Sequence, residues 1–150
     1  MKKLEIIVLK SDVTAMIDNI TRYTGKKTES ANPGALLERV ATVEADSVIL
    51  GRYWQDACAH VADALRSFIA SVQFGREILT LDMEVSNSYD ESLTPAVETG
   101  IQSLLADIIL CRWFRIAMPD RAAEWQREAA HQFDTLLANL YHRKKPKRAV

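Results

Sequence analysis

Apolar residues recur at steps of three and four positions over three long stretches of this chain of 150 residues. Such spacing places side chains on one face of an α-helix, and that face has to be buried against other elements. The longest stretch predicts a helix from about Val43 to Ser71, with Thr42 as its N-terminal cap. Its apolar stripe comprises Leu50, Trp54, Ala57 or Cys58, Val61, Leu65, Phe68 and Val72. A fold built on such stripes is a helical bundle.

The second half of the chain predicts a helical hairpin. Thr94 followed by Pro95 favours a helix start, because proline has a preset φ and loses no needed hydrogen bond at the first helical position. This helix is expected to run to about Ala117, and the next from about Asp120 to His142, with MPD as the break. The inward-facing residues are expected to be Val97, Ile101, Leu104, Leu105, Ile108, Cys111 and Phe114, then Trp125, Ala129, Phe133, Leu136, Leu137 and Leu140. The helix 43–71 is expected to cover the face that the two helices share.

Two segments have the period of two that is typical of strands. After Gly75, residues 77–85 alternate apolar and polar side chains, which predicts a strand that pairs with the N-terminal segment or forms a hairpin arm. Residues 4–9 are either a strand or the apolar start of a helix that ends at Gly25, a possible C-terminal cap. KKTESANPG follows as a linker, and ALLERVA as a short helical turn. The predicted fold is therefore mainly α, a helical bundle of about four main helices with a minor β element.

The charge is distributed unevenly along the chain. Nineteen basic and 20 acidic residues give a net charge of -1, and five of the basic residues lie between positions 143 and 148. They are Arg143, Lys144, Lys145, Lys147 and Arg148. Pro146 prevents the helix from continuing and biases Lys145 toward an extended conformation. We therefore divide the chain into a single helical domain, 1–142, with net negative charge, and a basic C-terminal tail, 143–150, on a projecting arm.

The basic tail has three interpretations. It can complement the dipole at the end of the last helix, bind nucleic acid, or bind the acidic body of a neighbouring copy. A protein whose main task is to grip duplex DNA would more often have a basic body, because phosphate neutralisation supplies most of the nonspecific affinity. The charge split therefore favours assembly, with a small nucleic-acid-binding module as the alternative.

Catalytic and metal-binding motifs are sparse. Glu128-x-x-His131 has the spacing that helical di-iron proteins use twice, but it occurs once here and is expected to be a surface pair. No glycine-rich phosphate loop is present. Cys58 and Cys111 each fall on an apolar stripe, which favours buried thiols over a disulfide. We predict a protein that is not an enzyme, with no metal and no organic cofactor.

Aromatic and targeting features complete the sequence-based predictions. Trp54 and Trp125 lie on apolar stripes and are expected in the core, whereas Trp113 lies between Arg112 and Arg115. A partly exposed aromatic residue between arginines is typical of an interaction hot spot.

The apolar N-terminal stretch contains Glu5 and lacks a small-residue cleavage site, and no apolar run approaches the roughly 20 residues that span a bilayer. The sequence therefore predicts a cytoplasmic protein with no membrane partner.

Several segments together resemble small structural proteins from the morphogenesis regions of tailed phages and prophages, similar to helical head-to-tail connector proteins. They are the YTG stop, RYWQDACAHVADAL, the SNSYDESLTP helix start, RWF and the closing LYHRKKPKR. The resemblance implies a non-enzymatic subunit that forms a homo-oligomeric ring, with other copies of itself and phage portal or tail proteins as partners. It also implies a location in the cytoplasm during assembly and then in the virion. REILTLDMEVS departs from the connector pattern, so a tail-completion role remains open.

Overall fold

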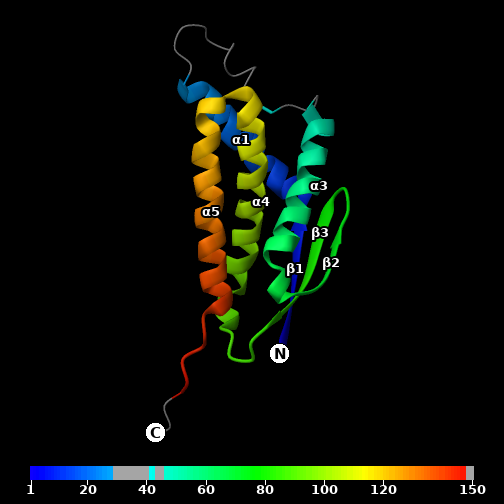
Figure 1. Ribbon diagram of the computed structural model, residues 1–150, viewed down its shortest axis with the longest axis vertical. Coiled ribbons are helices and arrows are strands. Elements are labelled where there is room, and N and C mark those ends of the chain that lie inside the picture. Colours follow the sequence, from blue (N-terminus) through cyan, green and yellow to red (C-terminus); the bar gives the residue numbers. More distant parts are fainter. Residues whose placement is uncertain (29–40, 43–45, 148–150) are drawn as a thin grey trace.

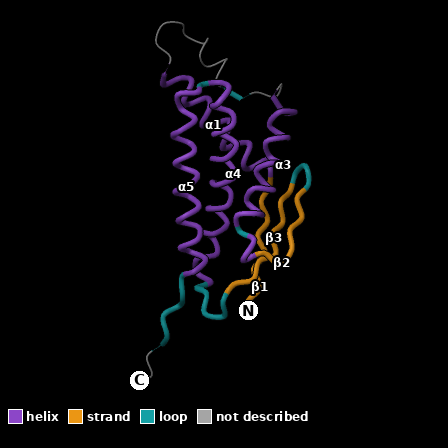
Figure 2. The backbone as a smooth tube through the Cα atoms, in the orientation of Figure 1, coloured by secondary structure: helices purple, strands orange, loops and turns teal. Residues whose placement is uncertain are grey.

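The computed structural model describes residues 1–28, 41–42 and 46–147 (Figure 1). The described elements are β1 (Lys2–Leu9), α1 (Lys10–Thr28), α3 (Ser47–Ala64), β2 (Ile69–Phe74), β3 (Ile78–Val85), α4 (Thr94–Ala117) and α5 (Pro119–Tyr141). Figure 2 shows the helices side by side, with the strands gathered against one side of them. The mainly α fold with a minor β element is confirmed.

The helical hairpin of α4 and α5 has the predicted bounds. Pro119 stands in the first turn of α5, as Pro95 does in that of α4. The two helices pack along their whole lengths, and the Cys111 thiol donates to the Ala122 carbonyl oxygen at 3.5 Å. Near the turn the Phe114 and Trp125 rings stack with centroids 5.9 Å apart. The apolar stripes read from the sequence thus meet in the hairpin seam.

The helix predicted for residues 43–71 is wrong at both ends. It ends at Ala64, and after a 3₁₀ turn over Arg66–Phe68 the chain forms β2, which pairs with β3. Phe68 is buried in the 3₁₀ turn, and Ile69 and Val72 are partly buried in the strand that follows it. At the other end Thr42 does not cap α3. Its backbone N–H donates to Thr21 Oγ1 at 3.0 Å, and Asp46 precedes the helix instead.

The sheet is antiparallel and has the strand order β1-β3-β2. Residues 77–85 were predicted to pair with the N-terminal segment or to form a hairpin arm, and β3 does both. Ile6 pairs with Leu81 on one side of β3, and Val72 pairs with Leu81 on the other. Of the two alternatives for residues 4–9, the strand is confirmed. Its inward residues Ile6 and Val8 are fully buried.

The N-terminal helix is longer than predicted. α1 begins at Lys10, whose N–H donates to the Glu77 carbonyl oxygen at 2.8 Å, and it continues through Gly25 to Thr28. Gly25 is therefore not the helix stop. The rest of the predicted linker and nearly all of the turn predicted at 35–41 lie outside the described residues.

Helix α4 is the centre of the molecule. Its buried residues join those of α1, α3, α5 and the sheet in one hydrophobic core. The stretch Glu91–Ala117 is long and apolar enough to cross a membrane, a criterion that a core helix such as α4 also meets. α3 packs mainly on α4, so the prediction that it covers the shared face of the hairpin is wrong. α3 and α5 instead flank α4 and leave a groove between them (Figure 1).

Candidate functional site

The base of the basic tail is bound to the body of the protein. The Arg143 guanidinium donates to the hydroxyls of Ser86 and Ser88, the latter at 2.9 Å. The Lys144 N–H donates to the Ser88 carbonyl oxygen at 2.7 Å, and the Asp90 N–H donates to the His142 carbonyl oxygen at 3.3 Å. These contacts form an isolated antiparallel bridge between Tyr89 and Arg143. Residues 142–144 are thus held as a short added strand.

The prediction that the whole basic run projects therefore needs correction. The Arg143 side chain and the Lys144 backbone N–H form hydrogen bonds within the chain, although both residues stay exposed. Lys145, Pro146 and Lys147 follow and are exposed. Arg148 lies outside the described residues. We call Lys145–Lys147 the arm, and residues 142–144 its anchor.

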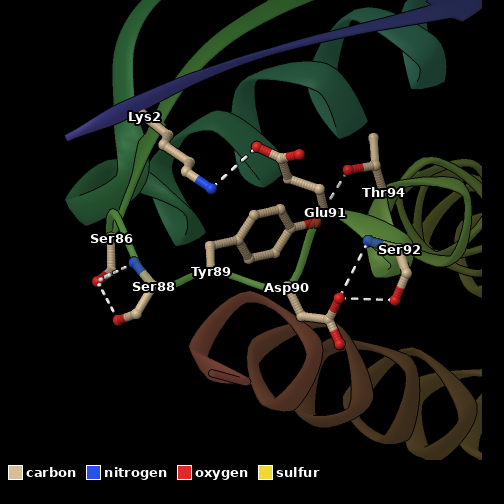
Figure 3. A network of polar contacts seen from close by, with 8 residues as sticks. All are labelled: Lys2, Ser86, Ser88, Tyr89, Asp90, Glu91, Ser92 and Thr94. Carbon is tan, nitrogen blue, oxygen red and sulfur yellow. Dashed lines mark hydrogen bonds and ion pairs between the residues drawn. The ribbon is translucent and has the colours of Figure 1, made fainter. Parts of the chain in front are cut away.

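The anchor rests on the loop that precedes α4, and Figure 3 shows the polar contacts within that loop. Tyr89 is buried, and its hydroxyl lies 3.2 Å from Thr94 Oγ1. The Ser92 N–H and hydroxyl donate to Asp90 Oδ1 at 3.1 and 2.6 Å, which fixes the turn into α4. Asp90 followed by Ser92 is a local turn signal within SNSYDESLTP, where the sequence predicts a helix start. The partner of that turn, at positions 142–144, had no local signal.

Two carboxylates of this loop are held ionised by their neighbours. The hydrogen bonds from Ser92 lower the pKa of Asp90, helped by the nearby charges of His142 and Lys144. Lys2 Nζ lies 2.9 Å from Glu91 Oε1 and lowers the pKa of Glu91 (Figure 3). β1, the α4 entry and the anchor therefore meet at one end of the molecule.

Of the predicted interaction residues Arg112, Trp113 and Arg115, the two arginines line one groove, whereas Trp113 is buried. Arg112 forms an ion pair with Asp56 of α3, and its guanidinium carbon lies 5.4 Å from the centroid of the Tyr53 ring. Arg115 is exposed. Trp113 is only 8% exposed and packs in the core, so the prediction of a partly exposed aromatic hot spot is wrong. In a helix such as α4, which α1, α3 and α5 all contact, flanking arginines do not mark the exposed face.

Arg112 and Arg115 do share the groove between α3 and α5. This groove has a volume of about 430 Å³ and a floor of α4 residues that includes Leu104, Ile108 and Cys111. Phe133 of α5 and Ala64 of α3 form its walls at the apolar end. The two arginines stand at the other end. It is an open apolar groove with a basic rim.

Asp107 is the one charged residue buried in the described core. It is 6% exposed, and its Oδ2 has no hydrogen-bond partner there. Burial raises its pKa to about 7, and the charge of Glu128 adds to the shift. A carboxyl with this pKa titrates near neutral pH. Ionisation of this buried carboxyl therefore costs stability.

The remaining chemical candidates stay apart. Cys58 and Cys111 are buried free thiols, as predicted, and burial raises the pKa of Cys58 to about 12. A thiol that resists ionisation is a poor nucleophile. Glu128 and His131 are exposed on α5, in agreement with a surface pair. Within residues 1–28, 41–42 and 46–147, no three His, Cys, Asp or Glu side chains gather as a metal site would require.

Comparison with known proteins gives no relative. No family model, curated protein or solved structure matches this chain.

Proposed function

We propose that this protein is a non-enzymatic assembly subunit that binds further copies of itself, acting in the virion as a head-to-tail connector or tail-completion protein of a tailed phage or prophage. Phage portal or tail proteins would be its other partners. It would be cytoplasmic during assembly and then part of the virion. The observation that carries the proposal is the anchored, exposed arm at the end of α5.

The anchor supports this proposal because it presets the direction of the arm. A free tail loses conformational entropy when it binds, and fixing its base in advance lowers that cost. Here Arg143 and Lys144 hold the base through three hydrogen bonds to Ser86 and Ser88, and Lys145 and Lys147 remain exposed. Such an arm suits the recognition of a surface that lies outside its own molecule.

The charge balance supports a partner of the same kind. The chain without residues 143–148 has 14 basic and 20 acidic residues, so a second copy presents a body of opposite charge to the arm. Surface charge pairs are individually weak, usually below about 1 kcal/mol, so the arm would steer association while apolar contacts add affinity. Contacts between an arm and a different surface of the next copy are heterologous, and these produce rings or filaments.

Truncation after Lys144 tests the proposal with the anchor kept intact. We expect removal of residues 145–150 to shift the melting temperature by no more than about 2 °C, because Lys145, Pro146 and Lys147 are exposed. Self-association measured by sedimentation velocity should weaken several-fold, more at about 50 mM than at about 300 mM salt, because salt screens exposed charges. Equal association of both proteins at every salt concentration would contradict the proposal.

The second candidate function is a nucleic-acid-binding module. The observation in its favour is that Lys145 and Lys147 are exposed on an extended segment, where they could follow a phosphate backbone. Titration of labelled single- and double-stranded oligonucleotides at two salt concentrations separates the two functions. Submicromolar affinity with a steep salt slope, lost on truncation after Lys144, would replace assembly by nucleic-acid binding. We expect no binding near about 150 mM salt.

A further inference from the structure

The sheet has one face that the described helices leave uncovered. Along β1 and β3 alternate residues point inward and are buried, among them Ile6, Val8, Leu79, Leu81, Met83 and Val85. The residues between them point to the other side. At the hairpin end this outer face carries Leu9 and its register partner Ile78, with Ile7 beside them. These three side chains are 41, 46 and 51% exposed, an unusual cluster for apolar residues on one small face.

The other end of the same outer face is acidic. Glu5 of β1 stands directly opposite Asp82 of β3, and Glu84 follows two positions further along β3, opposite Lys3. Within the described part of the chain no ion pair joins Glu5, Asp82 or Glu84 to a basic residue. Like charges placed directly opposite in an antiparallel pair destabilise it. An incoming basic group would relieve this repulsion.

The arm region has the same two parts in the same spacing. On the sheet, the row of Leu9 and Ile78 lies four residues from the row of Glu5 and Asp82, about 13 Å at the rise of a strand. The row of Lys3 and Glu84 lies two residues beyond, about 20 Å from the apolar row. On the arm side, Tyr141 ends α5 with its ring edge-on to Phe68 of the same chain, yet it stays 58% exposed, and Lys145 and Lys147 follow it by four and six residues.

We propose that the outer sheet face of one copy is the docking surface for the arm of a second copy. Tyr141 of the second copy would cover the apolar row, Lys145 would lie between Glu5 and Asp82, and Lys147 would reach Glu84. This inference rests on the proposed function and names the receptor that self-association would use. It also adds an aromatic contact to the weak charge pairs of the arm, since Tyr is among the residues that dominate binding energy at interfaces.

The position of the arm makes the contact one between different copies. In Figure 1 the C-terminal segment leaves the molecule beside α5, on the side away from the sheet. Its anchor on Ser86 and Ser88 holds the base in that place. Each copy then offers one arm and one sheet face at separate sites. Such contacts are heterologous and lead to a closed ring or an open filament.

A reciprocal charge swap tests the contact. The arm variant carries Lys145→Glu and Lys147→Glu, the sheet variant carries Glu5→Lys and Glu84→Lys, and the swap variant carries all four changes. We expect each reversal alone to weaken self-association about tenfold or more, because two ion pairs turn into repulsions. The swap variant should return to within about threefold of the original protein, since both pairs form again with exchanged signs. Sedimentation velocity at about 50 mM salt measures the self-association of the arm, sheet and swap variants.

Matched controls separate this contact from net charge and from misfolding. Glu98→Lys with Asp134→Lys changes the net charge as the sheet variant does, at exposed helix positions away from the sheet, and Arg52→Glu with Arg127→Glu matches the arm variant. Neither control pair should weaken self-association as much as the variant whose charge change it matches. Far-ultraviolet circular dichroism confirms that each variant folds. A swap variant that remains as weak as the single reversals would overturn the contact.

The outcomes distinguish this inference from the proposed function. If the arm variant loses association but the sheet variant does not, the arm binds elsewhere and the docking surface is wrong, while self-association through the arm stands. If neither reversal weakens association, both proposals fall. As a second readout, Lys145→Cys in one protein and Asp82→Cys in another should form a mixed disulfide on mixing, because the native thiols of Cys58 and Cys111 are buried. No mixed disulfide would also count against the contact.

Discussion

Replacing Asp107 by asparagine is expected to stabilise the protein by about 1 to 3 kcal/mol more at about pH 8 than at about pH 4.5. Asp107 is 6% exposed, its Oδ2 has no partner within the described residues, and its pKa is raised to about 7. In the unfolded chain the pKa of an aspartate is about 3.9. The folded state therefore keeps a proton over a range of pH in which the unfolded state releases it.

The sign of the effect follows from that difference. Below about pH 4 both states are protonated, and Asp107 costs nothing through ionisation. As the pH rises from about 4 to about 7, the free energy of unfolding falls by up to about 1.4 kcal/mol per pH unit. Partial exposure and relaxation reduce the total, which is why we expect less than the full sum. Asparagine does not titrate, so the variant escapes this loss.

Urea unfolding of both proteins between about pH 4.5 and pH 8 measures the effect. Asp134 is exposed on α5 and supplies the matched control, since Asp134→Asn should change stability equally at all pH values. Glu128→Gln should give a smaller stabilisation at neutral pH, because Glu128 contributes the second part of the pKa shift. A stability difference between the original protein and Asp107→Asn that does not vary with pH would show that ionisation of Asp107 does not lower the free energy of unfolding.

Replacing Trp54 by alanine is expected to lower the free energy of unfolding by about 3 to 5 kcal/mol. Trp54 is 1% exposed in the core, and its indole N–H donates to the Gly75 carbonyl oxygen at 3.0 Å. The substitution thus opens a cavity and releases the β2–β3 hairpin from α3. Small domains are stable by only about 5 to 15 kcal/mol, so this variant should melt far below the original protein.

Two further variants separate packing from the hydrogen bond. Trp54→Phe keeps an aromatic ring in the core but leaves the Gly75 carbonyl with one donor fewer, so we expect a smaller loss of about 1 to 2 kcal/mol. Gln55 donates to the same oxygen at 3.1 Å, but its contact is exposed, and Gln55→Ala should cost less than about 1 kcal/mol. Circular dichroism during urea unfolding gives all three values. Trp54→Ala within about 1 kcal/mol of the original protein would contradict the role assigned to Trp54.

For the candidate site, the sequence predicted the basic residues of the tail but not the residues that hold the base of the tail. The basic run after the last helix is visible as composition, and so is the charge split between tail and body. That Arg143 and Lys144 bind the loop at 86–90 depends on two segments more than 50 positions apart, which no local pattern connects. The outer sheet face arises in the same way, because Glu5 and Asp82 become neighbours only through strand register.

The sequence by itself determined the elements whose signal is local. Thr94 and Pro95, the break at Pro119 and the alternation over residues 78–85 suffice for α4, α5 and β3, since capping, proline chemistry and side-chain period act within a few residues. The tertiary structure decided the rest. Phe68 and Val72 fit the predicted helical stripe, but Phe68 ends a 3₁₀ turn and pairing with β3 places Val72 in a strand. Trp113 and Asp107 are buried because α1, α3, α5 and β1 pack around α4. This packing joins segments that lie far apart in the chain, so no local stretch of the sequence predicts it.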